Sequence, residues 1–188
     1  MPLPEITDHV LMLLVGKGQP QQLAVLFERH HLRLYNFFRK LGSSPATSED
    51  LVQETFIRML RYAGSYKETG QFVGWMYQIA RNATADCRSD SEYDDITDEA
   101  VQAELPAHTL NDPELLQSAH ETGQQLQRAL LRLPREKREL VLLSRISEFN
   151  NEDLARLFAC SQSAIKVRLH RSLLLLREYF DEERQDHH

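Results

Sequence analysis

Residues 150–180 read NNEDLARLFACSQSAIKVRLHRSLLLLREYF, and this stretch decides the fold of the second half of the chain. Asn150 or Asn151 can cap a short helix, and the residues Ala159-Cys160-Ser161 predict a tight turn after it. Ser161 or Ser163 can then cap a longer helix. The apolar positions of that longer helix repeat every four residues, at Ile165, Leu169 and Leu173. Two helices joined by so short a turn predict a helix-turn-helix.

The longer of these two helices concentrates positive charge. From residue 161 to residue 177 it holds four basic residues and no acidic one, within a region of near-zero net charge. Such a local excess indicates binding to phosphate groups, and the first half of such a helix meets base edges in DNA. The outward positions there are Lys166, Val167, His170 and Arg171. A solvated basic helix in a bundle is the structural alternative.

The distribution of charge also divides the chain. Of the 188 residues, 41% are hydrophobic and 27% charged, which excludes disordered and low-complexity classes. The net charge of −6 comes from residues 88–114, whose net charge is −8, whereas residues 1–87 and 115–188 each have a net charge of +1. The acidic segment is poor in large apolar residues and contains Pro106 and Pro113. We therefore predict two helical domains joined by a flexible acidic linker, with an exposed loop inside one domain as the alternative.

Residues 4–87 are expected to form three or four helices. A helix predicted over 48–61, capped by Thr47 or Ser48, has two faces of different kinds. The face expected to be buried consists of Leu51, Val52, Thr55, Phe56, Met59 and Leu60. The other face consists of Asp50, Gln53, Glu54, Ile57, Arg58 and Arg61. An isolated exposed isoleucine is ordinary on a protein surface, and a partner surface is the alternative that the residues leave open.

A further helix is predicted over residues 71–87. Its inward stripe consists of Phe72, Trp75, Met76, Ile79, Ala80 and Ala83. Its outward side consists of Gln71, Gln78, Arg81, Asn82 and Asp86. Amide and guanidinium groups within one turn can hydrogen-bond base edges, and Tyr66 in the preceding loop can stack on a base. On these residues alone, a solvated helix face is the alternative.

Several classes of function find no support in the sequence. No stretch approaches the roughly 18 consecutive apolar residues of a membrane span, and acidic residues precede the first apolar run, unlike in a secretory signal. Cys87 and Cys160 lie far apart and form no Cys/His cluster, so we expect neither a disulfide scaffold nor a metal site. Without a nucleophile–base pair or a glycine-rich phosphate loop, we expect no catalysis and no cofactor. The predicted location is the cytoplasm.

With both halves in view, the chain resembles the bacterial alternative sigma factors of the extracytoplasmic-function (ECF) type, over about residues 20–180. The motifs that carry the resemblance are SEDLVQETFIRML (48–60), FVGWMYQIARNATADCRSD (72–90), LPREKRELVLL (133–143), NEDLARLFACS (151–161) and AIKVRLHRS (164–172). Their order and the place of the linker agree with that family. The implied fold is all-α, with a helical region 2-like bundle and a helix-turn-helix region 4-like domain.

The resemblance implies a role for each motif. The first would bind the β′ clamp helices of core RNA polymerase through Asp50, Gln53, Glu54, Ile57 and Arg58. The second would read the melted downstream (−10) promoter element through Gln78, Arg81, Asn82 and Asp86, with a flipped-out base held by the loop residues Tyr66, Lys67, Glu68 and Gln71. The helix-turn-helix would read the upstream (−35) element as duplex, with Lys166, Val167, His170 and Arg171 facing bases and Ser161, Ser163 and Arg168 contacting phosphates.

The implied partners are core RNA polymerase, including its β subunit, promoter DNA, and an anti-sigma protein that holds the two DNA-binding domains. The acidic linker would occupy the basic RNA-exit and template channels of the polymerase, because its charge mimics that of nucleic acid. The second hypothesis is a stand-alone helix-turn-helix regulator. Such a regulator would bind duplex DNA without polymerase, but it gives no reason for the pattern from Trp75 to Asp86.

Overall fold

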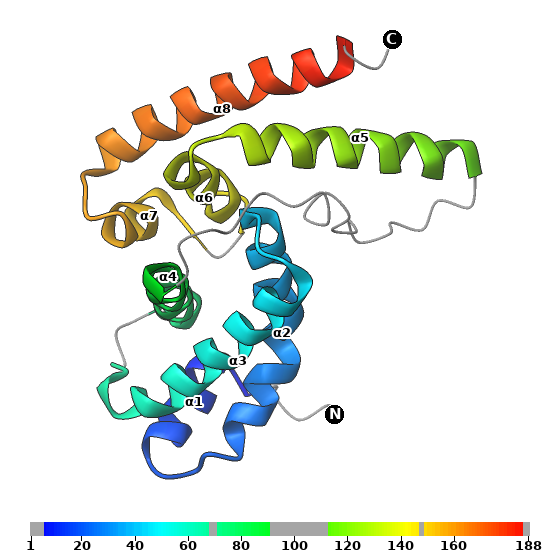
Figure 1. The fold of residues 1–188 in the computed structure, drawn as a ribbon. Helices are drawn as coiled ribbons and strands as arrows, with labels where there is room; N and C mark the ends of the chain where they lie inside the picture. Colours follow the sequence, from blue (N-terminus) through cyan, green and yellow to red (C-terminus); the bar gives the residue numbers. More distant parts are fainter. Residues whose placement is uncertain (1–5, 68–70, 91–112, 147–148, 186–188) are drawn as a thin grey trace, which may run out of the picture. The chain divides into compact units, whose positions relative to one another are not determined.

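The computed structural model of the chain describes residues 6–67, 71–90, 113–146 and 149–185, and within these ranges every regular element is helical (Figure 1). The predicted all-α fold is confirmed. The contacts divide the chain into two compact units, Met1–Asn36 with Ala46–Asp94 and Phe37–Pro45 with Asp95–His188. None of the helices in the described ranges combines the length and the apolar character needed to cross a bilayer.

The helices of the first half alternate with short turns. They are α1 (Asp8–Gly16), α2 (Gln22–Leu41), α3 (Pro45–Arg61), the 3-10 turn η1 (Ala63–Ser65) and α4 (Phe72–Asp90). The helix α2 ends where Gly42 adopts a left-handed φ of 101°, which a side chain would strain. The helix α3 begins at Pro45, so the predicted caps Thr47 and Ser48 lie inside its first turn and that prediction is wrong. Proline suits this first position because its missing N–H has no partner there in any case.

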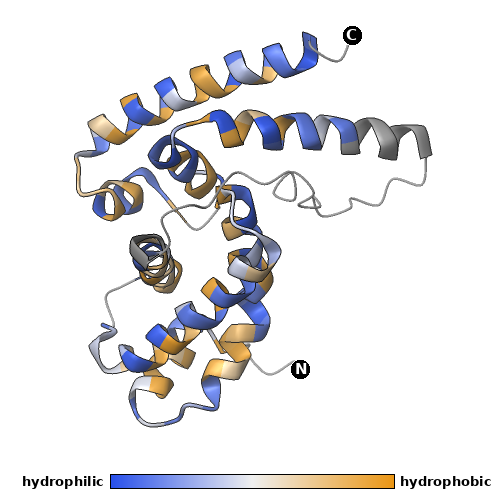
Figure 2. Cartoon of the chain, in the orientation of Figure 1, coloured by the Kyte–Doolittle hydropathy of each residue, from blue (hydrophilic) through white to orange (hydrophobic). Residues whose placement is uncertain are grey.

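The first unit buries one side of each helix against the others. Met12 of α1, Met59 of α3 and Met76 of α4 have no exposed surface, and Leu51 and Phe56 are also buried. Blue and orange alternate along α2 and α3 in Figure 2, as expected of helices that bury an apolar stripe. One predicted core residue is wrong: Leu60 is 46% exposed. Leu60 lies at the edge of the apolar stripe of α3. The spacing of apolar residues predicts which side of a helix is buried, but it does not predict how wide the buried side is.

The second unit contains α5 (Pro113–Arg132), α6 (Arg135–Leu143), α7 (Asn151–Leu157) and α8 (Gln162–Gln185). The long helix α8 packs against each of the other three. Leu169 and Leu173 of α8 pack on a buried cluster of Leu130, Leu133 and Val141. The far half of α8 is tied to α5 by Arg132, whose guanidinium pairs with Glu182 and Glu183 and lies 4.4 Å from the centre of the Tyr179 ring.

The helix-turn-helix forms as predicted, and the structure decides between the alternative caps. The Asn150 side chain accepts hydrogen bonds from the backbone of Glu152 and Asp153, and the Asp153 carboxylate accepts one from the backbone N–H of Asn150, which completes a capping box. In the turn, Ala159 adopts a left-handed φ of 49°. The Ser161 hydroxyl then accepts from the backbone N–H of Ala164 and caps α8.

Candidate nucleic-acid interface

An exposed stripe runs along α3. Asp50, Gln53 and Ile57 are all exposed, and Leu60 continues the same line at spacings of three and four residues. Ile57 is 52% exposed and lies outside the buried apolar side of α3. A stripe with apolar residues beside polar ones is compatible with a protein interface, which has an apolar core and a polar rim.

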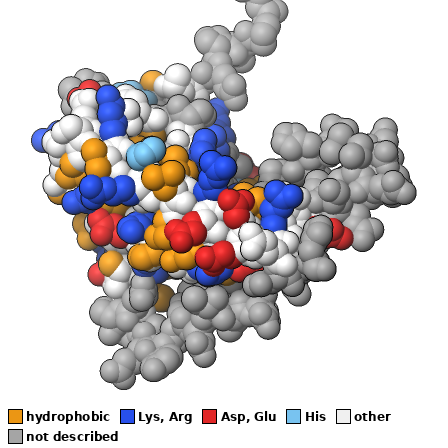
Figure 3. All heavy atoms as spheres, turned by 90° about the horizontal axis from the view of Figure 1, so that it is seen from above, with side chains coloured by type: hydrophobic (Ala, Val, Ile, Leu, Met, Phe, Trp, Pro, Cys, Tyr) orange, Lys and Arg blue, Asp and Glu red, His pale blue; other side chains and the backbone are white. Residues whose placement is uncertain are grey.

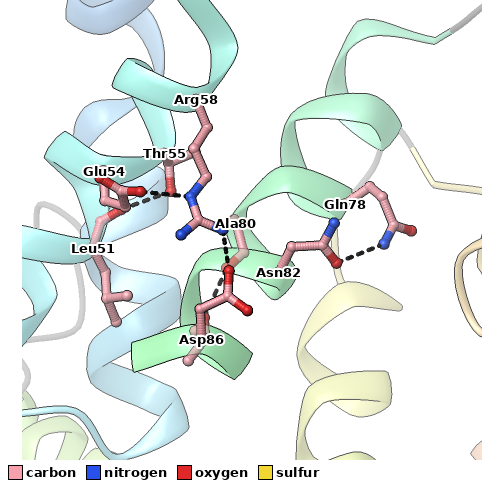
Figure 4. Close-up of polar contacts among 9 residues, drawn as sticks. Leu51, Glu54, Thr55, Arg58, Gln78, Ala80, Asn82 and Asp86 are labelled. Carbon is pink, nitrogen blue, oxygen red and sulfur yellow. Dashed lines mark hydrogen bonds and ion pairs between the residues drawn. The ribbon is translucent and has the colours of Figure 1, made fainter. Parts of the chain in front are cut away.

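Two other predicted residues of α3 turn away from this stripe toward α4 (Figure 4). Arg58 Nε donates to Glu54 Oε1 at 2.6 Å, and Arg58 Nη1 donates to Asp86 Oδ2 of α4 at 2.5 Å. The hydrogen bond to Glu54, followed by that to Asp86, raises the pKa of Arg58. The structure thus separates the five predicted polymerase-binding residues into an exposed stripe of three and a charged pair, Glu54 and Arg58, that links α3 to α4.

The outward side of α4 carries the predicted DNA-reading groups. Gln78 Nε2 donates to Asn82 Oδ1 at 3.2 Å, so the Asn82 amide is oriented with its nitrogen available as a donor (Figure 4). Asn82 and Asp86 are exposed, and Arg81 is half-buried. Between α3 and α4 lies an open pocket of about 320 Å³, lined by Arg58, Tyr62, Ile79, Asn82, Ala85 and Asp86. The pocket is therefore lined by hydrogen-bond donors (Arg58 and Asn82), a carboxylate acceptor (Asp86) and the aromatic ring of Tyr62.

The segment between η1 and α4 contains both exposed and buried residues. Lys67 and Gln71 are exposed, whereas Glu68 lies outside the described residues. Tyr66 is only 8% exposed. Its ring centre lies 4.9 Å from that of Trp75, and its hydroxyl shares a hydrogen bond of 2.8 Å with His9 Nδ1 of α1. In this conformation the Tyr66 ring is part of the core, and among the described residues of the segment Lys67 and Gln71 are exposed to a ligand.

The first half of α8 presents its predicted residues to solvent. Every member of the set is exposed: Ser161, Ser163, Lys166, Val167, Arg168, His170 and Arg171. Ile165 between them is fully buried, which fixes the rotation of the helix. Arg168 Nη1 donates to Glu136 of α6 at 3.2 Å, with both side chains well exposed. Seen from above the α8 helix of Figure 1, basic side chains lie among exposed hydrophobic ones, and acidic side chains are grouped beside them (Figure 3).

The structure adds three residues that the sequence patterns missed. Tyr62, 49% exposed, lines the pocket, and Leu60 extends the α3 stripe. His9 contacts Tyr66 across 57 positions of sequence. The exposure of Leu60 and Tyr62 had a weak signal in the sequence, since Leu60 follows Ile57 by three positions and Tyr62 follows Arg58 by four. The His9 contact had none, because no local pattern predicts so distant a pairing.

A helical unit with a polar outward side on α4 and a second unit with a basic helix-turn-helix are together typical of a two-part promoter-binding protein. Comparison with known families agrees. The family model described as sigma-70 region 2 matches residues 26–93, and that described as sigma-70, region 4 matches residues 123–176. The two matches fall on α2–α4 and on α5–α8.

Proteins similar to this chain include several RNA polymerase sigma factors. The chain is 31% identical over 157 residues to the RNA polymerase sigma factor CarQ of Myxococcus xanthus, covering 84% of this chain and 88% of CarQ. It is 25% identical over 175 residues to the ECF RNA polymerase sigma-E factor of Escherichia coli K12, covering 89% of this chain and 91% of that protein. The chain belongs to the ECF type of the sigma-70 family. It is an alternative sigma factor that directs promoter-specific transcription.

Solved structures show the same fold. The sigma factor RpoE of Bartonella quintana, crystallised with the anti-sigma factor NepR, matches with a TM-score of 0.64 and 25% identity, over 88% of this chain and 98% of that one. CnrH, solved in complex with the cytosolic domain of CnrY, matches in fold with a TM-score of 0.67 and 19% identity, over 93% of this chain and 97% of that one.

Proposed function

We propose that the chain recruits core RNA polymerase to promoters with the α3 stripe, reads the melted downstream element with α4, and reads the duplex upstream element with α8. The observation that carries this proposal is the exposure pattern. On each of the three helices, most of the side chains proposed to meet a partner are exposed, while the apolar stripe of the same helix is buried. The functional parts would be residues 1–87 and 115–188, with the acidic residues 88–114 as the linker between them.

The α3 stripe would meet the β′ clamp helices of the polymerase. Asp50 and Gln53 offer polar contacts, and Ile57 with Leu60 offers an apolar centre. Burying two aliphatic side chains that are now about half exposed would contribute about 1–2 kcal/mol. Glu54 and Arg58 would act on the adjacent side, where Arg58 pairs with both Glu54 and Asp86 and so connects the polymerase-binding helix to the promoter-reading helix.

The downstream strand would run over α4 and its first turn. Asn82 can donate to a base edge, and Asp86 can accept from an exocyclic amino group. Both line the pocket beside the Tyr62 ring, on which an unpaired base can stack. Gln71, Gln78, Arg81 and Lys67 would contact the same strand on either side. Because Tyr66 is buried, we propose that it supports this surface from below.

The upstream element would be read by α8 as duplex. Lys166, His170 and Arg171 present donors to base edges, and exposed Val167 can contact a thymine methyl group. Ser161, Ser163 and Arg168 at the start of the helix would contact phosphates. Arg168 would exchange its exposed partner Glu136 for a phosphate at little cost, because surface ion pairs contribute little.

Two further proposals concern the cellular setting. We propose that the chain has no catalytic activity and acts in the cytoplasm, where core polymerase is found. We also propose an anti-sigma partner, since the similar Bartonella quintana protein was crystallised with one. Exposed apolar side chains on both units, Ile57 on α3 and Leu174 on α8, offer contacts for such a partner. A pull-down from native cells that recovers only polymerase subunits would count against a dedicated anti-sigma protein.

The proposed division of roles can be tested in reconstituted holoenzyme. Ile57→Glu places a charge in the α3 stripe, and we expect at least tenfold weaker binding to core polymerase. The matched control is Leu32→Glu, which changes an equally apolar, 63% exposed residue on α2. Equal binding losses in the two variants would contradict an interface on α3.

The DNA-reading helices are tested separately. Asn82→Ala should leave core binding and duplex binding intact but reduce strand opening, detected by permanganate reactivity of downstream thymines. Arg171→Ala should instead weaken duplex binding at the upstream element and relax its sequence preference there. If both variants gave the same defect at the same step, separate roles for α4 and α8 would be excluded.

A further inference from the structure

The helix α1 lies before the residues that the region 2 family model matches, which begin at residue 26. It is nevertheless an integral part of the first unit. Leu11, Met12 and Val15 are at most 4% exposed, and α1 packs against both η1 and α4. These two elements flank the segment that carries Lys67 and Gln71. The position of α1 therefore bears on the surface proposed to read the downstream element.

The N-terminal end of α1 reaches both flanks of that segment, one by a direct hydrogen bond and the other through His30 of α2. His9 Nδ1 shares a hydrogen bond of 2.8 Å with the Tyr66 hydroxyl, directly before Lys67. Asp8 Oδ2 accepts a hydrogen bond of 2.6 Å from His30 Nε2, and the His30 ring lies 5.2 Å from the ring of Phe72, directly after Gln71. Two consecutive residues of α1 thus hold the neighbours of both exposed residues.

In both contacts the partner of the α1 residue is shielded from water, while Asp8 and His9 themselves are half-buried. His30 is 3% exposed, Tyr66 8% and Phe72 5%. Arg29 Nη1 donates to Asp8 Oδ1 at 2.6 Å, so the carboxylate is fixed by two partners at once. Burial, with the nearby Asp8 charge, raises the pKa of Tyr66 to about 12, so its hydroxyl keeps its proton and its hydrogen bond near neutral pH.

The other end of α1 fixes η1 by close backbone contact. A Cβ atom at Gly16 would lie 2.9 Å from the Ala63 carbonyl oxygen, a distance that real Cβ contacts do not show. The two backbones therefore approach as closely as a glycine allows. With His9 at one end and Gly16 at the other, α1 determines where η1 ends and where Tyr66 lies.

We propose that α1 is a positioning element for downstream-promoter specificity, in which His9 holds Tyr66 directly and Asp8 holds Phe72 through His30. These contacts thereby place Lys67 and Gln71 against the unpaired strand. The inference rests on the proposed function of α4 and its preceding segment. Packing alone would require only the buried Leu11, Met12 and Val15. The polar pair of Asp8 and His9 adds directional contacts, and directional contacts are what a base-reading surface needs from its support.

The test is run-off transcription by reconstituted holoenzyme on a promoter library randomised in the downstream element. Tyr66→Phe removes one oxygen and keeps the ring packing, so the fold is preserved. His9→Leu removes the other partner of the same hydrogen bond. We expect each variant to lower the ratio of preferred to disfavoured downstream bases by about fivefold, the equivalent of one ordinary hydrogen bond. Core binding and the upstream preference should stay as in the wild type.

Three further variants separate positioning from mere stability. His9→Gln keeps an acceptor for the Tyr66 hydroxyl and should restore most of the selectivity. The double variant of His9→Leu and Tyr66→Phe should be no less selective than either single one, because the same bond is lost. His31→Leu is the matched control, since His31 is likewise half-buried but bonds to the Phe27 carbonyl within α2. It should leave the base ratio unchanged.

Equal loss of transcription from every library member, without a change in base ratio, would overturn the positioning role and leave α1 a structural helix. Additive losses in the double variant would overturn it as well. If the wild type itself showed no downstream preference, the proposed function of α4 would fail, and this inference with it. The base preference of the wild type therefore shows whether the proposed function of α4 has failed or only the positioning role of α1.

Discussion

At the scale of single residues, Arg58 joins the helix proposed to bind polymerase to the helix proposed to read the promoter. Its guanidinium holds Glu54 on α3 and Asp86 on α4. We expect Arg58→Met to lower the free energy of unfolding by no more than about 1 kcal/mol, because Glu54 and Asp86 are 39% and 64% exposed and remain hydrated. We expect promoter strand opening to be clearly impaired even though the free energy of unfolding changes little, because α3 then no longer fixes Asp86.

Urea unfolding and permanganate reactivity of the same preparation measure the two effects. Arg177→Met is a suitable control, since Arg177 is 81% exposed and its Asp181 partner lies 3.8 Å away within the same helix. If Arg58→Met opened promoters as well as the control does, Arg58 would have no part in coupling α3 to α4.

Asp8 gives a pH-dependent prediction. Partial burial alone would raise the pKa of Asp8, but the hydrogen bonds from Arg29 and His30 and their positive charges outweigh it and lower the pKa below the model-compound value of 3.8. A carboxyl group with a lowered folded pKa stabilises the fold above its unfolded pKa, and this contribution disappears as the pH falls through the folded value. We expect Asp8→Asn to lower the free energy of unfolding at pH 7 by about 1–3 kcal/mol.

The difference between wild type and Asp8→Asn should therefore begin to shrink below about pH 4, where Asp8 of the unfolded chain takes up a proton, and should disappear as the pH falls through the lower pKa of the folded state. Urea unfolding at a series of pH values measures it. A stability difference that stayed constant from pH 7 to pH 3 would show that the Asp8 charge does not contribute.

At the residue scale, exposed positions were more predictable than buried ones. Every predicted base- or phosphate-facing residue of α8 is exposed, because the four-residue repeat of Ile165, Leu169 and Leu173 fixes the rotation of that helix. Tyr66 behaved differently. Its burial depends on His9 and Trp75, and the His9 contact spans 57 positions, so a local pattern that shows an aromatic residue in a loop cannot show what covers it.

At the scale of elements, the capping box of α7 makes a prediction for the helix-turn-helix. Asn150→Ala removes the acceptor for two backbone N–H groups and should destabilise α7 by about 1 kcal/mol. Asn151→Ala, one residue inside the helix and exposed, is the matched control and should have little effect. Hydrogen exchange of the α7 amides measures the difference. Equal exchange rates in the two variants would show that the capping box does not stabilise this helix.

The sequence predicted helix ends well where a side chain caps the helix, and less well where none does. The sequence offered two candidates for each cap of the helix-turn-helix, and the structure selects Asn150 and Ser161. For α3 the sequence indicated Thr47 or Ser48, yet the helix starts at Pro45. Several Ser and Thr residues in a row give equivalent capping signals, and the packing of the first turn, where Ser48 is fully buried, decides among them.

At the scale of the whole molecule, charge is the property that the sequence assigns most clearly. Residues 88–114 hold nine acidic residues and one basic residue. If all nine acidic residues became the corresponding amides, the free chain should bind non-promoter duplex DNA more tightly and with a steeper dependence on salt. The physical reason is that the acidic residues of the proposed linker would repel the phosphate groups that α8 is proposed to bind.

Fluorescence anisotropy of a labelled duplex across a range of salt concentrations measures this effect. A variant with the same 27 residues in scrambled order is the control, and it should behave as the wild type because its charge is unchanged. Unchanged duplex affinity of the amide variant would contradict an electrostatic role for the linker.

The central claim is that this chain gives RNA polymerase its promoter specificity, and run-off transcription tests it most directly. Core polymerase is supplied with a promoter library, with and without the chain, and the transcripts are sequenced. We predict initiation that requires the chain and occurs at promoters sharing an upstream and a downstream element. Initiation that is the same without the chain, together with tight duplex binding by the chain alone, would contradict the claim and favour a stand-alone helix-turn-helix regulator.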